Sequence, residues 1–375
     1  MKKLNYFGLL LLASVMLLSC EDNTPTEPEN EPEEDPELVV TQLDREPFYT
    51  SNPLSSEVSQ FTVTHEAQKL EFFGWGGITS DAQINMTFPE NTEYYNRAIL
   101  TYRMGGWNEG PSDWDHTTLI MLYDKTTEDY YEIARAFTPY GYTFGSTWSK
   151  YYYMDVTEFL PMLTGDCEFR VWYGGFDATA TKAHTVKMTF DFYSEAAILP
   201  RTVFTEKIYD SRFNSNGYRG WYYGSESKPI EADSVMGLRE FTVPEDVESL
   251  TLRVSITGHG MEQGVFPDRD GYSTKNAAEF DYNYYDMIVN GENFGQGYIF
   301  WENGDNYYQA GTYLTDRANW GPGQPANVQY WKIDGIPNDR KITIDLDLEN
   351  YISPNDSPIA FYIVQVDAFG MDSSE

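Results

Sequence analysis

The sequence has little cysteine and little positive charge, and both shortages narrow what the protein can be. Cys20 and Cys167 are the two cysteines in 375 residues, so a disulfide-rich scaffold is excluded. Lys and Arg number 25 against 59 Asp and Glu, which gives a net charge of -34. Because this charge repels a polyphosphate backbone, nucleic acid is not expected as a partner.

Several common functional motifs are also missing from the sequence. It contains no P-loop, no GxGxxG after a strand and no GxSxG, which argues against nucleotide-binding and acyl-hydrolase functions. The four histidines form no HxH or HExxH motif, and the calcium-like run 268–279 has Ser273 where the turn needs glycine. We therefore expect neither a metal site nor a cofactor.

The N-terminus has the pattern of an export signal. Lys2 and Lys3 precede an apolar run that is too short to remain as a membrane span. The run ends in LLSC, which resembles the lipobox of bacterial lipoproteins. This pattern predicts a signal peptide over residues 1–19 and a lipidated Cys20. A plain secretory signal or an uncleaved anchor is the alternative.

Residues 20–40 alternate proline with acidic side chains, which predicts an extended tether. Acidic residues directly after the cysteine resemble signals that export lipoproteins in Gram-negative bacteria. We expect a lipid-anchored protein on the outer membrane, facing the cell surface or the periplasm. The anchor is its expected contact with the membrane. Cys167 alternates with apolar neighbours and is expected to be a buried hydrophobic residue.

Elsewhere, apolar residues recur with period two in short runs separated by Gly, Asn, Asp and Pro. Such runs indicate antiparallel β-sandwiches. The stretch 194–202 has no strand pattern and divides the chain into two halves. The predicted strands are RAILTYRM (97–104), TTLIMLYD (117–124), CEFRVWY (167–173), TVKMTFDFY (185–193), SLTLRVSI (249–256), YDMIVNG (285–291), VQYWKID (328–334) and ITIDLDL (342–348).

The two halves echo each other. Residues 89–105 and 244–260 have equal length, and both run from Pro-Glu through an alternating strand to glycine. An acidic-aromatic-acidic triplet follows in each half, DWD at 113–115 and EFD at 279–281. The ordered series predicts two copies of one sandwich.

Asp115 and Glu279 are the candidate catalytic residues within these triplets. An aromatic wall holds the apolar face of a sugar, and a carboxylate beside it can orient or activate water. If the two copies lie side by side, equivalent loops face one cleft and bring the two carboxylates together. The alternative is that each is a turn residue at the start of a strand.

Five blocks, in order, resemble the bacterial peptide-N-glycosidase F type amidases, over roughly residues 70–372. The resemblance implies an all-β fold of two adjacent eight-stranded antiparallel jelly-roll β-sandwiches, at 70–197 and 198–375, after a short extension at 41–69. It also implies an enzyme that releases intact N-glycans from asparagine. The blocks are SDWDHTTLIMLYDKTTEDYYEIARAFTPY (112–140), MDVTEFLPMLTGDCEFRVW (154–172), SITGHG (255–260), AAEF (277–280) and TDRANWGPG (315–323).

Carried over by position, the family's essential aspartate corresponds to Asp115 and its second-domain glutamate to Glu279. Arg317, Trp114 and Trp320 correspond to residues lining the cleft that binds the chitobiose core of the glycan. N-glycosylated peptides and glycoproteins are the implied substrates, and we expect a monomer.

Four positions depart from the family pattern, and we retain them as substrate-binding candidates. A family glutamate corresponds to Gly174, an arginine to His116 and a strand-end tryptophan to Phe176. A Trp-Gly-His turn reads His-Gly-Met from His259. These changes leave the central carboxylate pair but alter its surroundings.

The missing glutamate leads to a hypothesis about substrate preference. Without a side chain at Gly174, the protein is expected to admit cores with α1,3-linked fucose, of plant and insect type. Reduced activity, or replacement of the lost carboxylate by Asp177, is the alternative. A surface glycan-binding lipoprotein without catalysis remains a second function class, and a hydrolase cutting between the two GlcNAc residues a third.

Overall fold

The protein is described by a computed structural model, in which the chain from Asp35 onward forms one compact unit. No helix in the described part is long and apolar enough to cross a membrane. Nearly all of its regular structure is antiparallel β-sheet, which confirms the all-β prediction. The described residues are 34–71, 81–194, 199–210, 213–214, 217–218, 221–222, 236–260, 279, 283–301, 317–348 and 361–373.

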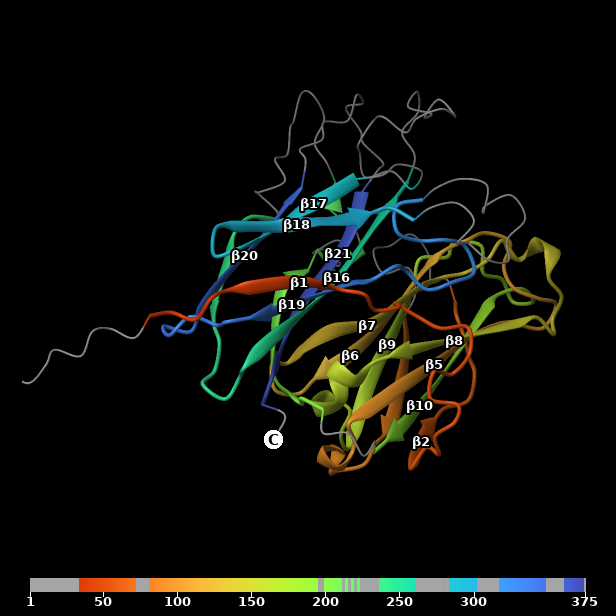
Figure 1. Ribbon diagram of the computed structural model, residues 1–375. Helices are drawn as coiled ribbons and strands as arrows, with labels where there is room; N and C mark the ends of the chain where they lie inside the picture. The colour runs from red at the N-terminus through yellow and green to blue at the C-terminus, as the bar shows by residue number, and fades with distance from the viewer. Residues whose placement is uncertain are drawn as a thin grey trace, which may run out of the picture. The chain divides into compact units, whose positions relative to one another are not determined.

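The first half of the chain forms a sandwich of two sheets, with strand orders β2-β10-β5-β8 and β4-β9-β6-β7 (Figure 1). Numbered by their order in the chain, these eight strands read 1-8-3-6 and 2-7-4-5, which is jelly-roll connectivity. The strands are β2 (Phe61–Thr64), β4 (Asp81–Thr87), β5 (Arg97–Gly106), β6 (Thr117–Asp124), β7 (Asp129–Phe137), β8 (Ser149–Asp155), β9 (Asp166–Tyr173) and β10 (His184–Tyr193).

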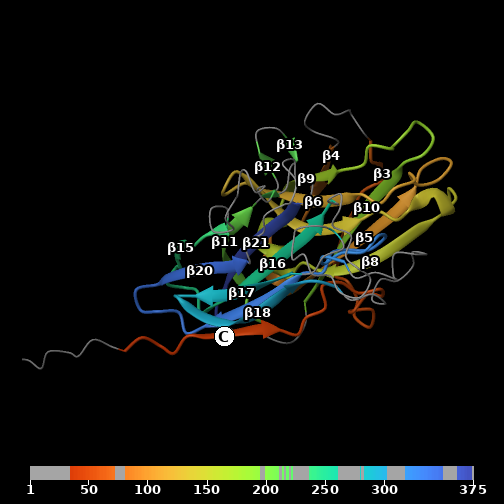
Figure 2. The ribbon, with the colours of Figure 1, turned by 90° about the horizontal axis from the view of Figure 1, so that it is seen from above.

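The second half repeats this topology. Its sheets have the orders β11-β21-β16-β19 and β15-β20-β17-β18, and Figure 2 shows β20, β17 and β18 side by side. The same strand order in both halves supports the duplication predicted from the sequence echo. The strands are β11 (Thr202–Asp210), β15 (Arg239–Thr242), β16 (Ser249–His259), β17 (Asn283–Val289), β18 (Glu292–Ile299), β19 (Gln329–Asp334), β20 (Lys341–Leu348) and β21 (Phe361–Met371).

The segment predicted as a short N-terminal extension, 41–69, contributes to both sandwiches. β1 adds to the second at the edge strand β19, whereas β2 and β3 pair with β10 of the first. β1 also starts within the last two residues of the predicted tether. The remaining elements are β1 (Val39–Leu43), β3 (Gln68–Lys69), β12 (Phe213–Asn214), β13 (Gly217–Tyr218), β14 (Trp221–Tyr222) and the 3₁₀ turns η1 (Thr92–Tyr94), η2 (Gly141–Thr143) and η3 (Thr157–Met162).

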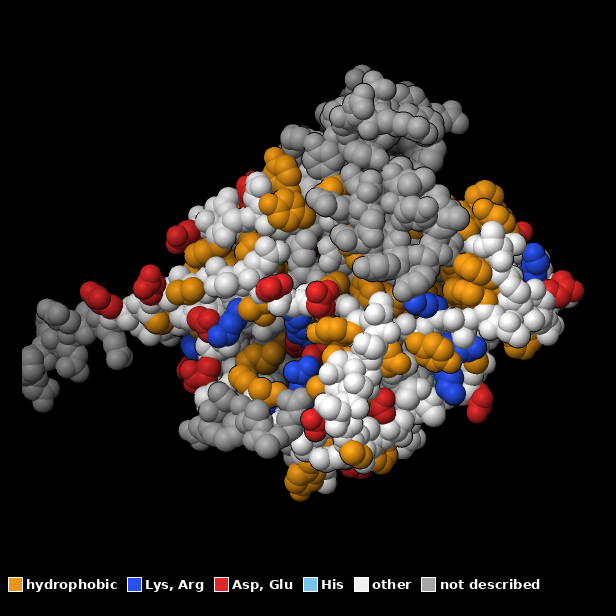
Figure 3. Space-filling view, turned by 45° about the vertical axis from the view of Figure 1, so that its right-hand side comes forward, with side chains coloured by type: hydrophobic (Ala, Val, Ile, Leu, Met, Phe, Trp, Pro, Cys, Tyr) orange, Lys and Arg blue, Asp and Glu red, His pale blue; other side chains and the backbone are white. Residues whose placement is uncertain are grey.

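Each sandwich encloses its own hydrophobic core, as period-two strands require. In β20, for example, Ile342, Ile344, Leu346 and Leu348 are buried, while the residues between them are less buried. The alternating apolar side chains fill the space between the two sheets. Acidic and basic side chains are interspersed over the face of the molecule in Figure 3.

The two sandwiches meet where the outer face of β16 covers β7. The core face of β16 is apolar, but its other face, with Arg253, Ser255 and Thr257, is buried as well. Arg253 Nη1 donates to the carbonyl oxygen of Glu132 in β7 at 3.0 Å. A polar strand face is therefore buried because it forms part of the contact between the copies.

A β-bulge in β7 creates the main ion pair of this contact. The register places Ala134 opposite Ile120 and Glu132 opposite Met121, so Ile133 is the extra residue. Residues three apart normally point to opposite faces of a strand.

Here the bulge lets Arg135 donate to both carboxylate oxygens of Glu132, at 3.1 and 2.8 Å. Arg135 Nη1 also donates to Thr257 Oγ1 at 2.7 Å and to the carbonyl oxygen of Ile363 at 2.8 Å. The pair is fully buried and joins the two sandwiches.

Candidate functional site

Asp115 lies in the loop between β5 and β6. The residues on either side of it, Trp114 and His116, are both hydrogen-bonded to Thr138 at the end of β7. The backbone N–H of His116 donates to Thr138 Oγ1 at 2.7 Å, and that hydroxyl donates to the carbonyl oxygen of Trp114 at 3.3 Å. The N–H of Thr138 donates to the carbonyl oxygen of His116 at 2.9 Å. The backbone around Asp115 is therefore fixed from β7.

Asp177, in the loop between β9 and β10, holds the same segment from the other side. Its Oδ2 accepts the N–H of Trp114 at 2.9 Å, and its Oδ1 lies 2.9 Å from His116 Nε2. Burial acts to raise the pKa of Asp177, but the hydrogen bonds and charge from His116 and Trp114 outweigh it and the pKa is lowered. Asp177 thus remains ionised and positions the His116 ring.

Glu279 lies in the loop between β16 and β17, the second sandwich's equivalent of the Asp115 loop. Its N–H donates to the carbonyl oxygen of Gly260 at 3.1 Å, and its carbonyl oxygen accepts the N–H of Ala318 at 3.0 Å. Arg317 begins the described part of the loop before β19 and exchanges two backbone hydrogen bonds with Trp301, at 2.8 and 3.1 Å. Backbone pairing therefore sets Glu279 beside the Arg317 segment.

Asn319 makes the turn that follows Arg317. Its φ of 63° lies in the left-handed region, which asparagine tolerates better than most residues. Its side chain is buried, donates to the carbonyl oxygens of Ile256 and Tyr298 at 3.0 and 2.8 Å, and accepts the N–H of Phe300 at 2.7 Å. The turn is therefore anchored to the strands of the second sandwich.

Arg317 lies between the two predicted catalytic carboxylates. Its Nη1 is 3.8 Å from Asp115 Oδ2 and 3.4 Å from Glu279 Oε1. The side chain of Arg317 is 1% exposed, compared with 12% for Asp115 and 20% for Glu279. The structure thus brings the equivalent loops together, as the repeat predicted. No group of three His, Cys, Asp or Glu suited to a metal ion occurs in the described residues.

Both carboxyl groups have raised pKa values. For Asp115, burial raises the pKa more than Arg317 and His116 lower it. For Glu279, burial is again the largest cause, Arg317 opposes it and the nearby Asp115 adds to it, so the pKa rises to about 7. Two carboxyl groups that share one cation and have raised pKa values are suited to moving protons.

Tyr140 is a site residue that the sequence analysis did not identify. It hydrogen-bonds to Asp115 and to Arg317, and burial raises the pKa of its hydroxyl, to which the Asp115 charge adds. It lies between β7 and β8, the loop equivalent to the one carrying Arg317. This equivalence between the two loops, rather than spacing along the chain, is the signal that points to Tyr140.

A stack of rings supports Arg317 from behind. The Arg317 Cζ atom lies 4.5 Å from the centre of the Trp320 ring, and that ring stacks on Phe137 at 4.4 Å. Trp320 Nε1 donates to the carbonyl oxygen of Gly258 at 2.7 Å. Trp320 is thus buried beneath the guanidinium rather than presented as an open wall.

His259 belongs to the same stack, 5.5 Å from the Trp320 ring. Thr257 Oγ1 accepts a hydrogen bond from Arg135 Nη1 and shares a second one with His259 Nε2, 2.7 Å away. Burial lowers the pKa of His259 well below its usual range, and the charges of Arg135 and Arg317 add to this. His259 is therefore a neutral, buried support.

Trp114 and Phe176 are the exposed aromatic residues of the site. The Phe176 ring packs edge-on against His116 at 5.0 Å, and the Trp114 ring lies 6.2 Å from Tyr140. These two rings remain available to a ligand.

Gly174 lies beside the Trp172 ring. A Cβ atom added at Gly174 would lie 3.0 Å from Trp172 Cη2. The ring therefore occupies part of the space that a side chain at position 174 would need.

Cys167 is buried as expected, and burial raises the pKa of its thiol to about 11. Asp113 forms an exposed ion pair with Lys182 at 3.1 Å, apart from the Arg317 cluster. Cys20 and the signal peptide lie outside the described residues.

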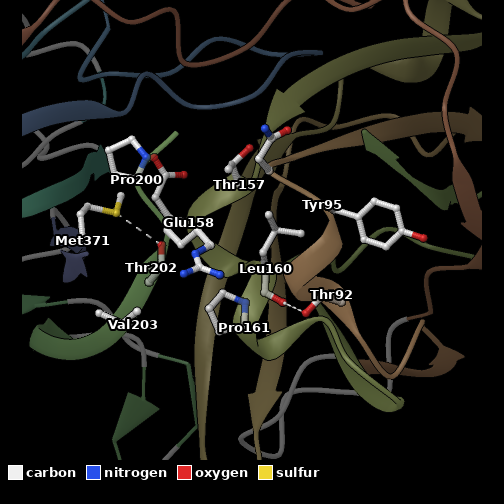
Figure 4. Close-up of a pocket in the computed structure, with 12 residues that line it drawn as sticks. Thr92, Tyr95, Thr157, Glu158, Leu160, Pro161, Pro200, Thr202, Val203 and Met371 are labelled. Atoms are coloured by element: carbon white, nitrogen blue, oxygen red, sulfur yellow. Dashed lines mark hydrogen bonds between the residues drawn. The ribbon is translucent and has the colours of Figure 1, made fainter. Parts of the chain in front are cut away.

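A hollow of about 350 Å³ lies away from this cluster, between η3 and β11 (Figure 4). Its charged residues already have partners, because Glu158 pairs with Arg45 and Arg201 pairs with Asp372. None of the predicted site residues lines it.

The chain is similar to known proteins in sequence and in fold. No protein-family model matches the chain. A curated relative, peptide-N(4)-(N-acetyl-beta-D-glucosaminyl)asparagine amidase F of Elizabethkingia miricola, is 22% identical over 303 residues, 77% of this chain and 77% of that protein.

Solved structures have a similar fold. A crystal structure of peptide-N(4)-(N-acetyl-beta-D-glucosaminyl)asparagine amidase matches with a TM-score of 0.65 at 18% identity, over 84% of this chain and 97% of the other. A structure of PNGF-II matches with a TM-score of 0.55 at 14% identity, over 90% of this chain and 66% of the other. These likenesses confirm the resemblance read from the sequence and show a shared fold.

Proposed function

We propose that this protein is an amidase that releases intact N-glycans by hydrolysing the bond between the glycan and its asparagine. The observation that carries the proposal is the placement of Asp115 and Glu279, from equivalent loops of two jelly rolls, on either side of the buried Arg317. The exposed rings of Trp114 and Phe176 offer surfaces for the apolar faces of a sugar. The likeness to the amidase from Elizabethkingia miricola supports the same chemistry.

In the proposed reaction, water adds to the asparagine carbonyl carbon and the bond to the glycosylamine nitrogen breaks. Asp115 is the principal carboxylate and takes the proton of the attacking water. Glu279, whose pKa of about 7 keeps part of it protonated at neutral pH, donates a proton to the leaving nitrogen. Arg317 and Tyr140 favour the ionised form of Asp115, the form that accepts this proton. The asparagine becomes aspartate, and the glycan leaves as a glycosylamine.

Incubation of the purified protein with a denatured N-glycoprotein tests this function. Mass spectrometry of the peptides should show asparagine converted to aspartate and the whole glycan lost. Glycan binding without a mass change would identify a binding module instead. A single GlcNAc left on the peptide would identify a hydrolase acting between the two core sugars.

The absence of a side chain at Gly174 underlies a finer proposal, that the enzyme also accepts cores with α1,3-linked fucose. A larger residue at position 174 would press against the Trp172 ring. Both carboxylate oxygens of Asp177 already form hydrogen bonds, one with Trp114 and one with His116. Asp177 therefore does not replace the missing carboxylate in this arrangement. Equal release from matched plant and mammalian glycopeptides is expected. Release from the mammalian type alone would contradict the proposal.

We also propose that Cys20 anchors the protein to the outer membrane of a Gram-negative cell through attached lipid. The LLSC motif and the acidic tether support this proposal. A Cys20→Ser variant should move from the membrane fraction to the soluble fraction. Retention of the variant in the membrane would contradict lipidation at this cysteine.

A further inference from the structure

Two cations lie directly opposite each other on the outer face of the first sandwich. Lys187 of β10 is the cross-strand partner of Arg103 in β5. Like charges in this position destabilise a sheet. Within the described part of the chain, neither cation forms an ion pair, although acidic residues outnumber basic ones 59 to 25. This local excess of positive charge favours an anionic ligand.

Gly105, two residues along the same strand, leaves room for the Arg103 side chain. A Cβ atom added at Gly105 would lie 3.0 Å from Arg103 Nη1 and 3.1 Å from its Cζ. The guanidinium therefore lies beside the glycine, in space that a larger residue would share with it and with Thr185 Oγ1, which would be 2.8 Å from the added Cβ. On the neighbouring strand, Tyr151 faces Arg103, with its ring centre 5.9 Å from the guanidinium carbon.

A hollow of about 310 Å³ lies over these residues. Its lining is suited to a sugar: Tyr151 is 46% exposed, and the Thr101 and Thr189 hydroxyls can hydrogen-bond. Glu66 also lines it and would repel a ligand with several negative charges. Such a lining fits a ligand with a single negative charge.

We propose that this hollow binds a sugar bearing one carboxylate, such as the terminal residue of an acidic glycan. The guanidinium of Arg103 matches the two oxygens of a carboxylate, and Lys187 adds a second positive charge. Tyr151 takes the apolar face of the sugar ring. The assignment of this sugar to a glycan arm of the substrate rests on the proposed amidase function.

Calorimetric titration of the full chain with sialyllactose tests the site, with lactose as the uncharged counterpart. Sialyllactose should bind and lactose should bind at least about tenfold more weakly, because charge-assisted hydrogen bonds are lost. Sialyllactose binding should also weaken as salt is added. Equal binding of both sugars, or no saturable binding of sialyllactose, would overturn the proposal.

Variants then locate the binding. Arg103→Gln should weaken sialyllactose binding about tenfold, and Gly105→Ala, which keeps the charge but displaces the guanidinium, should weaken it as well. Lys332→Gln removes one positive charge from an exposed ion pair with Asp334 and should leave binding unchanged. Undiminished binding by Arg103→Gln with a normal melting temperature would overturn the assignment.

A last comparison separates this site from the amidase activity. Arg103→Gln should release a neutral glycopeptide at the wild-type rate but show a higher KM for a sialylated one. Failure of the wild type to release the neutral glycopeptide would contradict the proposed function and leave the sialyllactose titration valid. Tighter binding of digalacturonate than of sialyllactose would overturn the substrate-arm assignment in favour of a uronic acid polymer.

Discussion

Two buried ionic arrangements join the sandwiches, and they differ in how completely their charges are paired. Arg135 and Glu132 form a two-pronged pair with 0% exposed side chains. Arg317 is nearly as buried, yet its contacts to Asp115 and Glu279 are long, at 3.8 and 3.4 Å, and both carboxylates are partly open to solvent.

The difference indicates separate roles for the two arrangements. A fully paired, enclosed ion pair fixes geometry and has nothing left to offer a ligand. A cation shared by two carboxyl groups with raised pKa values leaves protons that can move. We therefore assign the Arg135 pair to assembly of the two copies and the Arg317 cluster to chemistry.

The largest expected effect comes from Asp115→Asn. Replacing the principal carboxylate should lower the rate of glycan release by about 10²- to 10⁴-fold, the usual contribution of a general base. The fold should be retained, because the backbone of the loop is held by Thr138 and Asp177. Release assays and thermal melting, run in parallel, measure the two properties. Activity above a few per cent of wild type would contradict the assigned role.

Arg135→Met should instead lower the stability of the fold. It leaves Glu132 buried without its cation, which should reduce the free energy of unfolding by about 3–5 kcal/mol. Urea denaturation measures this loss. A Glu132→Met, Arg135→Met double variant is the matched control and should recover much of the stability. A single variant as stable as wild type would mean that the pair does not support the fold.

Glu279→Gln should change how stability depends on pH. The folded pKa of Glu279 is raised from 4.5 to about 7, so the folded protein holds the proton more tightly than the unfolded chain. Its contribution to stability is therefore present below about pH 4.5 and is lost as the pH rises through 7.

Melting temperatures of wild type and Glu279→Gln, compared at pH 5 and pH 8, isolate this contribution. The wild type should lose more stability between the two pH values than the variant does. An identical pH dependence in both proteins would argue against a raised pKa at Glu279.

Asp113→Asn should have the smallest effect. Asp113 is one residue away from Trp114, but its ion pair with Lys182 is exposed. Exposed pairs contribute about 0–1 kcal/mol, so stability and glycan release should stay close to wild type. A large loss of activity would show that the reacting region extends to this surface.

The sequence identified much of the fold because its strands are clearly patterned. All eight predicted runs coincide with strands, from β5 to β20, since alternating side chains face a core in each sandwich. The echo between the halves also predicted that Asp115 and Glu279 come together. Their catalytic roles remain predictions.

Other features have no signature in local periodicity. The bulge at Ile133 places Glu132 and Arg135 on the same face of β7, and a period-two pattern cannot reveal one inserted residue. Likewise, the polar face of β16 reads as solvent-exposed until its partner sandwich is known. Tyr140 lies in a loop, where spacing alone predicts no contact with Asp115.

The N-terminal segment has a consequence for dividing the protein. β1 precedes the first sandwich in the chain but covers the edge strand β19 of the second. A fragment starting at residue 198 would therefore expose unpaired backbone along β19, and exposed strand edges promote aggregation. A soluble second half would need residues 39–43 supplied as a separate peptide or joined to its own end.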